Sequence, residues 1–292
     1  QNLPAAMGAE LSCTSRHCMG QSALLDVHSQ RQQKESAETR DIEELRALIL
    51  GKRPSLAKTT RKGGSALSDH LDAFTLRRFL RAEKGKQRIA KAAEAILGYL
   101  EWREREKVDE VFSEKLDPQL DAVLSASYSP RLLNGNDLRL RPIVLTQLGR
   151  LDLQALEKQG VSQQMVIRRQ VRELERLRRA IEASAYPDQG HLAIFDLQGM
   201  TVSRFRYGWG LISEINKIGS TYYPDLMGTI CLINAPTAVV WAIGAVKTIL
   251  HPDTAAKIQT KNGDPTEGLA RLMPASLIPP EVKPGSVAAP AS

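Results

Sequence analysis

Few residues of this chain have the types and spacing that enzymatic chemistry requires. The sequence contains no Gly-rich phosphate loop, no His-Glu-x-x-His helix and no Gly-x-Ser-x-Gly elbow. Its five histidines are scattered, and Asp196, which ends an apolar run, more simply caps or turns the chain than acts as a catalytic acid. Cys13, His17 and Cys18 could suggest a metal site, but a fourth ligand is missing. We therefore expect no enzyme activity, no metal and no cofactor.

A candidate modification motif lies near the N-terminus. From Met7 the chain reads Met-Gly-Ala-Glu-Leu-Ser-Cys, which fits the myristoylation pattern at Gly8, with Cys13 next to it as a candidate palmitoylation site. Two acyl chains are what stable membrane anchoring requires. The pattern is short and matters only if Gly8 becomes the N-terminus, so a chance match is the alternative.

The positive charge is unevenly distributed. The net charge is +7, and between positions 46 and 91 basic residues far outnumber three acids. Such a surface favours an anionic partner, either nucleic acid or an acidic membrane, although a solvated face without a partner is the alternative. Because aromatic residues make up only 5% of the chain, stacking platforms for nucleic acid are scarce, which favours the membrane.

Cysteine usage and hydropathy indicate the setting. Three cysteines give no disulfide framework, so an intracellular location fits best, with Cys231 as a core residue. The most apolar segment, Thr237 to Leu250, is shorter than the roughly 20 residues that span a bilayer. We expect a monomer that is cytoplasmic and peripheral to membranes.

The chain divides into regions by its hydrophobic periodicity. Residues 1–40 are polar without an amphipathic period and predict a disordered tail. Residues 41–116 have apolar side chains at helical spacing and predict a helical bundle, whose first helix ends at Gly51 and Pro54. Residues 281–292 predict a loose C-terminal tail in a Pro-rich stretch that begins at Pro274.

Residues 117–280 alternate between apolar runs and amphipathic helices. The strand candidates are RPIVLTQLGRL, HLAIFDLQG and GTICLINA, and the helix candidates between them begin at Val161, with an Arg-rich outer face, and at Val202. This alternation predicts an α/β domain with a mostly parallel sheet that is covered by helices. The segment TAVVWAIGAVKTIL then poses a problem, because a helix that is apolar on nearly every side is unusual at a protein surface.

Several stretches in order resemble the CRAL-TRIO (SEC-fourteen-like) lipid-binding family. They cover about residues 70 to 280 and read DAFTLRRFLRAEKGKQRIAKAAEAILGYLEWR, DLRLRPIVLTQLGRLD, HLAIFDLQGMTVSRF, YYPDLMGTICLINAP and HPDTAAKIQT. The resemblance implies a helical N-terminal module and an α/β domain whose sheet floors a large apolar pocket for a lipid. It also explains the apolar helix as a gate that opens at the membrane, with one face toward the core and another toward lipid. The gate residues would be Trp241, Ile243, Val246, Ile249 and Leu250.

The resemblance also implies positions for the lipid headgroup. Where phosphatidylinositol-transferring members have Glu-Arg after the YYP run, this chain has Asp225-Leu226, and the family's basic residue downstream matches Lys257. The family's Arg-Ala-Arg-Lys run reads Arg-Ala-Glu-Lys here and ends at Lys84. Lys84, Asp225 and Lys257 are the headgroup candidates.

Other pocket and rim positions depart from the family pattern or are less specific. Positions where phosphatidylcholine binders have hydroxyls read His191 and Ala193, and Tyr222 and Tyr223 are expected to pack at the rim. The resemblance therefore implies a protein that binds one lipid, favours phosphatidylinositol and transfers or presents it at membranes. The alternatives are a carrier of a sterol, tocopherol or retinoid, and a membrane-tethered regulatory or scaffold protein that senses lipid.

Overall fold

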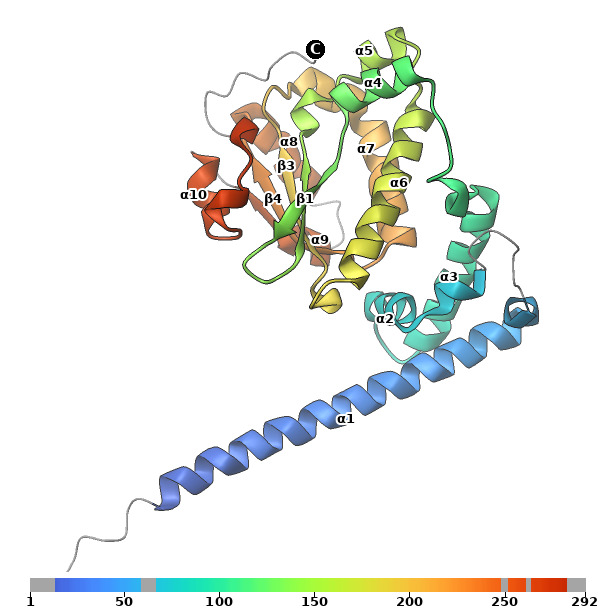
Figure 1. Ribbon diagram of the computed structural model, residues 1–292, viewed down its shortest axis with the longest axis vertical. Coiled ribbons are helices and arrows are strands. Elements are labelled where there is room, and N and C mark those ends of the chain that lie inside the picture. The colour runs from blue at the N-terminus through green and yellow to red at the C-terminus, as the bar shows by residue number, and fades with distance from the viewer. Residues whose placement is uncertain (1–13, 59–66, 248–251, 261–263, 283–292) are drawn as a thin grey trace, which may run out of the picture.

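The computed structural model describes residues 14–58, 67–247, 252–260 and 264–282 (Figure 1). Three long helices come first, and together with the short turns between them they form what we call the helical module: α1 (Thr14–Lys52), α2 (Ala73–Ala82) and α3 (Arg88–Arg105). The remaining strands and α-helices are α4 (Pro118–Ser127), β1 (Arg131–Asn136), β2 (Pro142–Thr146), α5 (Leu153–Lys158), α6 (Gln163–Glu182), β3 (His191–Asp196), α7 (Val202–Tyr222), β4 (Met227–Ile233), α8 (Thr237–Lys247), α9 (Pro252–Lys257), β5 (Ile258–Thr260) and α10 (Pro265–Ala270). Short 3-10 helices occur between them, including η2 (Leu67–Leu71) and η3 (Val108–Glu110).

The strands form one sheet in the order β1-β2-β3-β4-β5. The pair β1–β2 is antiparallel, and the other three pairs are parallel. Strands β2, β3 and β4 lie within the three apolar runs named above, so the prediction of a mostly parallel sheet is confirmed. Strands β1 and β5 were not predicted, because β1 is exposed along nearly its whole length and β5 has only three residues.

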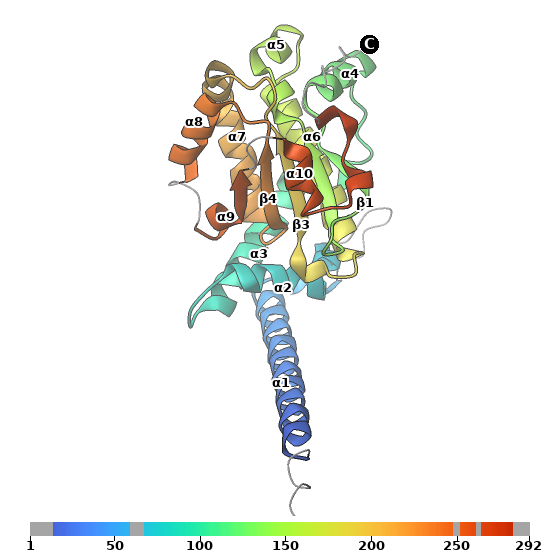
Figure 2. The same ribbon diagram turned by 90° about the vertical axis from the view of Figure 1, so that its left-hand side faces the viewer.

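The order of the parallel strands decides where the helices lie. Each successive strand is added on the same side, and right-handed crossovers then place α6, α7 and α8 on one face of the sheet. Figure 1 shows α6 and α7 on one side of the strands and α10 on the other, and Figure 2 shows α8 beside α7. The face that carries α6 to α8 is therefore the one where a gate formed by α8 would act.

Side-chain alternation along the strands divides the core between the two faces. Leu192, Ile194, Cys231 and Ile233 pack toward α10 and the C-terminal segment, whereas Phe195 on β3 and its neighbours on β4 pack toward α8. Asp196, at the end of β3, accepts hydrogen bonds from the Gln198 N–H and the Asn234 amide (3.1 and 3.0 Å). Its side chain fixes the turn, as expected for a capping residue.

The prediction of a disordered tail over 1–40 is wrong from Thr14 onward, where α1 begins. Residues 30 to 40 are rich in Gln, Arg, Lys, Glu and Ala, which have high helix propensity, so this segment is helical although it has no apolar stripe. The short helix expected from Asp41 is the C-terminal part of α1, where Ile42, Leu45 and Ile49 are buried. Gly8 and Cys13 lie outside the described residues.

The Arg-rich face of α6 holds the connection between the two parts of the chain. Arg168 donates to the carbonyl of Glu106 (2.6 Å) and pairs with the carboxylate of Glu114. Arg172 donates to the carbonyls of Val111 and Glu114 (2.9 and 2.8 Å). These arginines therefore satisfy backbone acceptors of a connecting segment that has little regular structure of its own.

The C-terminal stretch is more ordered than expected up to residue 282. Ile278 and Val282 are buried against the sheet, and Asn234 donates to the carbonyl of Val282 (3.2 Å). The burial of two apolar side chains explains why this Pro-rich segment is fixed. Residues 283–292 lie outside the described part of the chain.

Among the residues that the structure describes, we find no helix with both the length and the apolar character to cross a membrane.

Candidate functional site

The apolar face of the sheet under α8 is loosely covered among the described residues. Here Ile230 and Leu232 of β4 lie with Val239 of α8 in a small cluster of buried residues. Several large apolar side chains around that cluster are only partly buried: Phe195, Phe205, Met227, Ile243 and Ile258. Large apolar side chains that keep partial exposure side by side are typical of a surface that takes up an apolar ligand. We call this surface the lipid face.

Helix α7 borders the lipid face with an apolar stripe of its own. Phe205, Trp209 and Ile212 recur at helical spacing, and all three are half-buried. The rings of Phe205 and Trp209 are 5.6 Å apart. In the whole of α7 only Gly208 and Leu211 are buried, which is little for a helix of 21 residues that packs against a sheet. Part of its apolar surface therefore stays exposed beside the lipid face.

Helix α8 covers the lipid face and also exposes apolar surface to solvent. Val239 is buried and Ile243 packs beside the cluster, whereas Trp241 on another side of the helix is 78% exposed. This arrangement accounts for a helix that is apolar on nearly every side. The side chain of Val246 and the residues Ile249 and Leu250 lie outside the described part of the chain, so their role in a gate stays a prediction.

Two charged side chains lie at the starts of β4 and β5, which are neighbours at one edge of the sheet. Asp225 precedes β4, Lys257 precedes β5, and the Lys257 ammonium is 3.7 Å from the Asp225 carboxylate. Because Met227 and Ile258, near the beginnings of these strands, belong to the lipid face, the pair lies at one end of that face. Burial raises the pKa of Asp225, and the positive charge of Lys257 acts in the opposite direction. Lys84, the third headgroup candidate, is exposed in the turn after α2.

Arg78 is a neighbour of this pair that the sequence analysis missed. It is only 4% exposed, and its Nε donates to the carbonyl of Pro224 (2.9 Å), directly before Asp225. Its Nη1 has no hydrogen-bond acceptor, and among the described residues no carboxylate lies within ion-pair distance of its guanidinium. Desolvation lowers the pKa of Arg78 to about 10. In the sequence, Arg78 stands directly before Phe79 on the apolar side of a helix, and this position was the signal that its side chain is buried.

Leu226 stands at the position where the family resemblance implies an arginine, and an apolar side chain cannot make the polar contacts of that residue. The leucine side chain is 2% exposed and packs in the core between α6, α7 and the helical module. The structure thus places a buried guanidinium, Arg78, next to Asp225 while the position after Asp225 is apolar. The positive charge of Arg81, near the end of α2, also opposes the rise in the pKa of Asp225. Arg81 pairs with Asp188 at 3.0 Å.

His191 and Ala193, expected to line the pocket, are both buried in β3. The His191 Nδ1–H donates to the carbonyl of Leu226 (2.7 Å). This close approach needs Gly190, where φ is +66° and a Cβ would lie 2.3 Å from the same carbonyl oxygen. In this structure the imidazole is therefore engaged with the backbone.

We expect His191 to make the protein sensitive to mild acid. Burial lowers the pKa of His191 from 6.5 to about 4, so between these values the unfolded chain binds a proton that the folded chain does not. The free energy of unfolding should then fall by about 3 kcal/mol between pH 7 and pH 4 through this residue. Urea denaturation at several pH values should show a smaller loss of unfolding free energy for His191→Gln than for the wild type. Equal pH dependence of the two proteins would show that His191 is not the source of the acid sensitivity.

Tyr222 and Tyr223 contact the helical module. Tyr222 stacks on Trp102, with ring centroids 4.2 Å apart, and the hydroxyl of the buried Tyr223 donates to Glu175 (2.6 Å). We expected both tyrosines at the rim of a lipid pocket, but the contacts seen here are with the helical module and with α6. A buried tyrosine hydroxyl needs a polar partner, and Glu175 supplies one at the junction between the modules.

Comparison with known proteins agrees with this architecture. The model of the family described as CRAL/TRIO domain matches residues 127–283. Sec14 cytosolic factor of Schizosaccharomyces pombe is 26% identical over 216 residues, which cover 73% of this chain and 74% of the relative. A protein of Arabidopsis thaliana named phosphatidylinositol/phosphatidylcholine transfer protein SFH4 is 29% identical over 227 residues, which cover 74% of this chain and 36% of the relative.

A solved structure has the same fold. The crystal structure of Sfh5 superposes with a TM-score of 0.56 at 15% sequence identity, covering 77% of this chain and 80% of that one. The family match extends over more than half of the chain and includes the whole sheet and the helices that cover it. The resemblance seen in the sequence is thereby confirmed, and the chain belongs to the CRAL/TRIO family.

Proposed function

We propose that this protein binds a single lipid on the lipid face, beneath α8, and transfers or presents it at membrane surfaces. The observation that carries the proposal is a half-buried apolar surface with a polar group at one end, which matches the two parts of a phospholipid. Burial of an acyl chain gains about 0.8 kcal/mol for each CH₂, so a lipid can be extracted without covalent chemistry. The relatives named as lipid transfer proteins support this function.

A phosphatidylinositol-type lipid is the ligand that we favour. The Asp225 carboxylate can accept hydrogen bonds from inositol hydroxyls, and Lys257 and Arg78 offer positive charge to a phosphate. A hydrogen bond to a charged group contributes about 1.5–3 kcal/mol. Arg78 would gain most, because its buried guanidinium lacks a carboxylate partner among the described residues.

The burial of Leu226 favours a second candidate, a carrier of a sterol, tocopherol or retinoid. The family resemblance implies an arginine at this position, and a buried leucine cannot contact a phosphate, so selectivity for an anionic headgroup should be weaker. The tethered lipid sensor remains a prediction that depends on Gly8 and Cys13. In each version we propose a monomer that works at the surface of membranes.

The purified protein should move fluorescent phosphatidylinositol from donor to acceptor vesicles, and mass spectrometry should find an inositol lipid bound to it. Lys257→Gln should slow transfer of this lipid by about tenfold, because a charge-assisted contact is lost. The matched control is Lys217→Gln, an exposed lysine on α7, which should transfer at the original rate. The absence of both transfer and co-purifying lipid would refute the proposal, and a sterol or tocopherol as the only bound species would establish the second candidate.

A further inference from the structure

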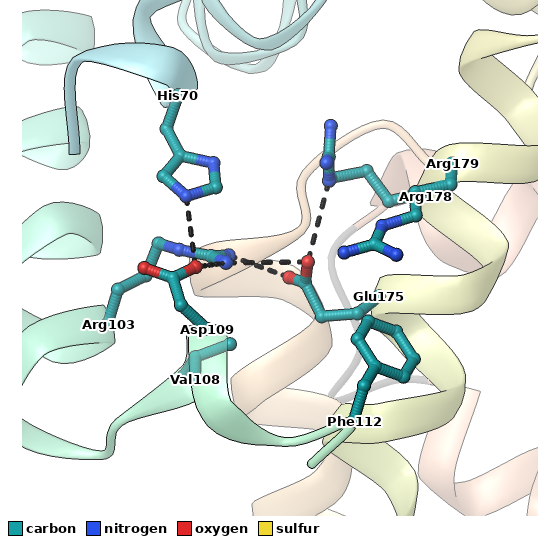
Figure 3. Close-up of a pocket in the computed structure, with 8 residues that line it drawn as sticks. All are labelled: His70, Arg103, Val108, Asp109, Phe112, Glu175, Arg178 and Arg179. Atoms are coloured by element: carbon teal, nitrogen blue, oxygen red, sulfur yellow. Dashed lines mark hydrogen bonds and ion pairs between the residues drawn. The ribbon is translucent and has the colours of Figure 1, made fainter. Parts of the chain in front are cut away.

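A cavity of about 140 Å³ lies where the helical module meets α6 (Figure 3). One wall consists of His70, Arg103 and Asp109 from the first part of the chain, and the other of Glu175, Arg178 and Arg179 from α6. The volume is several times the ~30 Å³ that a water molecule occupies in the liquid, so a larger polar group fits. The residues that line this cavity are different from those of the lipid face.

Both carboxylates of the cavity already have cationic partners. Asp109 receives hydrogen bonds from Arg103 and from the ring of His70 (3.1 Å for the latter). Glu175 accepts from Arg103 at 2.7 Å and from the Tyr223 hydroxyl. No oxygen of either carboxylate needs a further cation to be neutralised.

The guanidinium groups, in contrast, have unused donors. Three arginines and two carboxylates line the cavity, which gives the lining an excess of one positive charge. Arg178 also pairs with Glu182, outside the lining, at 3.1 Å. The Nε atoms of the buried Arg103 and Arg178 have no hydrogen-bond acceptor, and the Arg178 Nε lies 3.7 Å from the Glu175 carboxylate, at ion-pair distance. Arg179 lies 4.4 Å above the ring of Phe112 and, within the described part of the chain, has no ion-pair partner. Figure 3 shows the side chains of Arg178 and Arg179 extending from α6 into the cavity, with Arg178 joined to Glu175 by a dashed line.

We propose that this cavity binds a small oxyanion of the phosphate class, with Arg178 and Arg179 as its main ligands. Paired arginine forks match the oxygens of a phosphate group. The buried Arg178 offers a donor without an acceptor, and the exposed Arg179 offers a guanidinium that has no ion-pair partner among the described residues. Because the walls belong to different parts of the chain, the bound anion connects the helical module to α6 and stabilises their relative orientation.

Inorganic phosphate is the probe that tests the site. Calorimetric titration of the lipid-free protein at constant ionic strength should give saturable binding that a matched titration with chloride does not. Arg179→Ala should bind phosphate at least about tenfold more weakly, and Arg179→Lys should recover part of the loss. The matched control is Arg176→Ala, because Arg176 is an exposed arginine of the same helix that pairs with Glu173 and does not line the cavity.

The source of the anion can be separated in the same experiment. If the protein loaded with phosphatidylinositol no longer binds phosphate, the site belongs to a lipid headgroup, and if binding persists, it belongs to a soluble anion. Vesicle transfer of lipid by Arg179→Ala reports on the proposed function independently. Binding of phosphate that equals that of chloride, or that is unchanged in Arg179→Ala, would overturn the proposal and leave a cavity that contains water only.

Discussion

Replacing Glu175 by glutamine should lower the free energy of unfolding by about 3–5 kcal/mol. The side chains of Arg103 and Glu175 are 1% and 2% exposed, and their ion pair connects α3 to α6. Glutamine keeps the size of the side chain but removes the charge, so Arg103 retains only Asp109 as a counterion and Arg178 loses a neighbour 3.7 Å away. A buried charge left without its partner is among the largest effects that a single substitution has.

Urea denaturation followed by circular dichroism measures this loss. The matched control is Glu173→Gln on the same helix, because Glu173 pairs with an exposed arginine, Arg176, and such pairs contribute at most about 1 kcal/mol. If the two substitutions lower the free energy of unfolding equally, the pair between Glu175 and Arg103 does not stabilise the contact between the helical module and α6.

The pH dependence of this deficit is a further check on the same pair. Burial alone would raise the pKa of Glu175, but the charge and hydrogen bonds of Arg103, with the Tyr223 hydroxyl, outweigh it and lower the pKa. A carboxyl group whose pKa is lowered by folding stabilises the protein above its unfolded pKa, near 4, and loses this contribution as the pH falls through the folded pKa. The difference between wild type and Glu175→Gln should therefore shrink in strong acid.

The sheet and the junction differ in how far the sequence could predict them. Strands β2, β3 and β4 are buried on both faces and read as continuous apolar runs, which single-sequence patterns reveal. The exposed edge strand β1 and the three-residue β5 lack that pattern, since their pairing depends on neighbours that are distant in sequence. The junction combines His70, Arg103 and Glu175 from separate elements, so no local spacing could have brought them together.

The candidate site was predicted from the family resemblance more than from spacing. Asp225 and Lys257 meet because β4 and β5 are parallel neighbours, which places the starts of the two strands side by side. Arg78 was missed because a helical pattern does not show whether an arginine next to an apolar stripe is buried. Its burial follows from the packing of α2 against the segment that contains Pro224.

Replacing Trp241 by alanine should reduce lipid transfer by about 10- to 100-fold without affecting the fold. The side chain is 78% exposed, so its removal should change the free energy of unfolding by less than about 0.5 kcal/mol. Tryptophan is enriched at membrane interfaces, and burying a large apolar side chain contributes about 1.5–3 kcal/mol, which corresponds to the expected loss. We expect Trp241 to enter the interface when α8 meets a membrane and the lipid face opens.

Sedimentation with vesicles and fluorescent lipid transfer measure the two consequences, membrane binding and exchange. The matched control is Leu138→Ala, because Leu138 is also an exposed apolar residue, at 58%, but follows β1 at the opposite edge of the sheet. Trp241→Phe, which keeps an aromatic ring, should retain most of the activity. If Trp241→Ala binds and transfers as the wild type does while Leu138→Ala is impaired, the membrane contacts the edge of the sheet at β1, and α8 is not the gate. Among the described residues of α8, Trp241 is the only side chain that is both large and largely open to solvent. That result would therefore show that the lipid does not enter through the exposed apolar surface of α8.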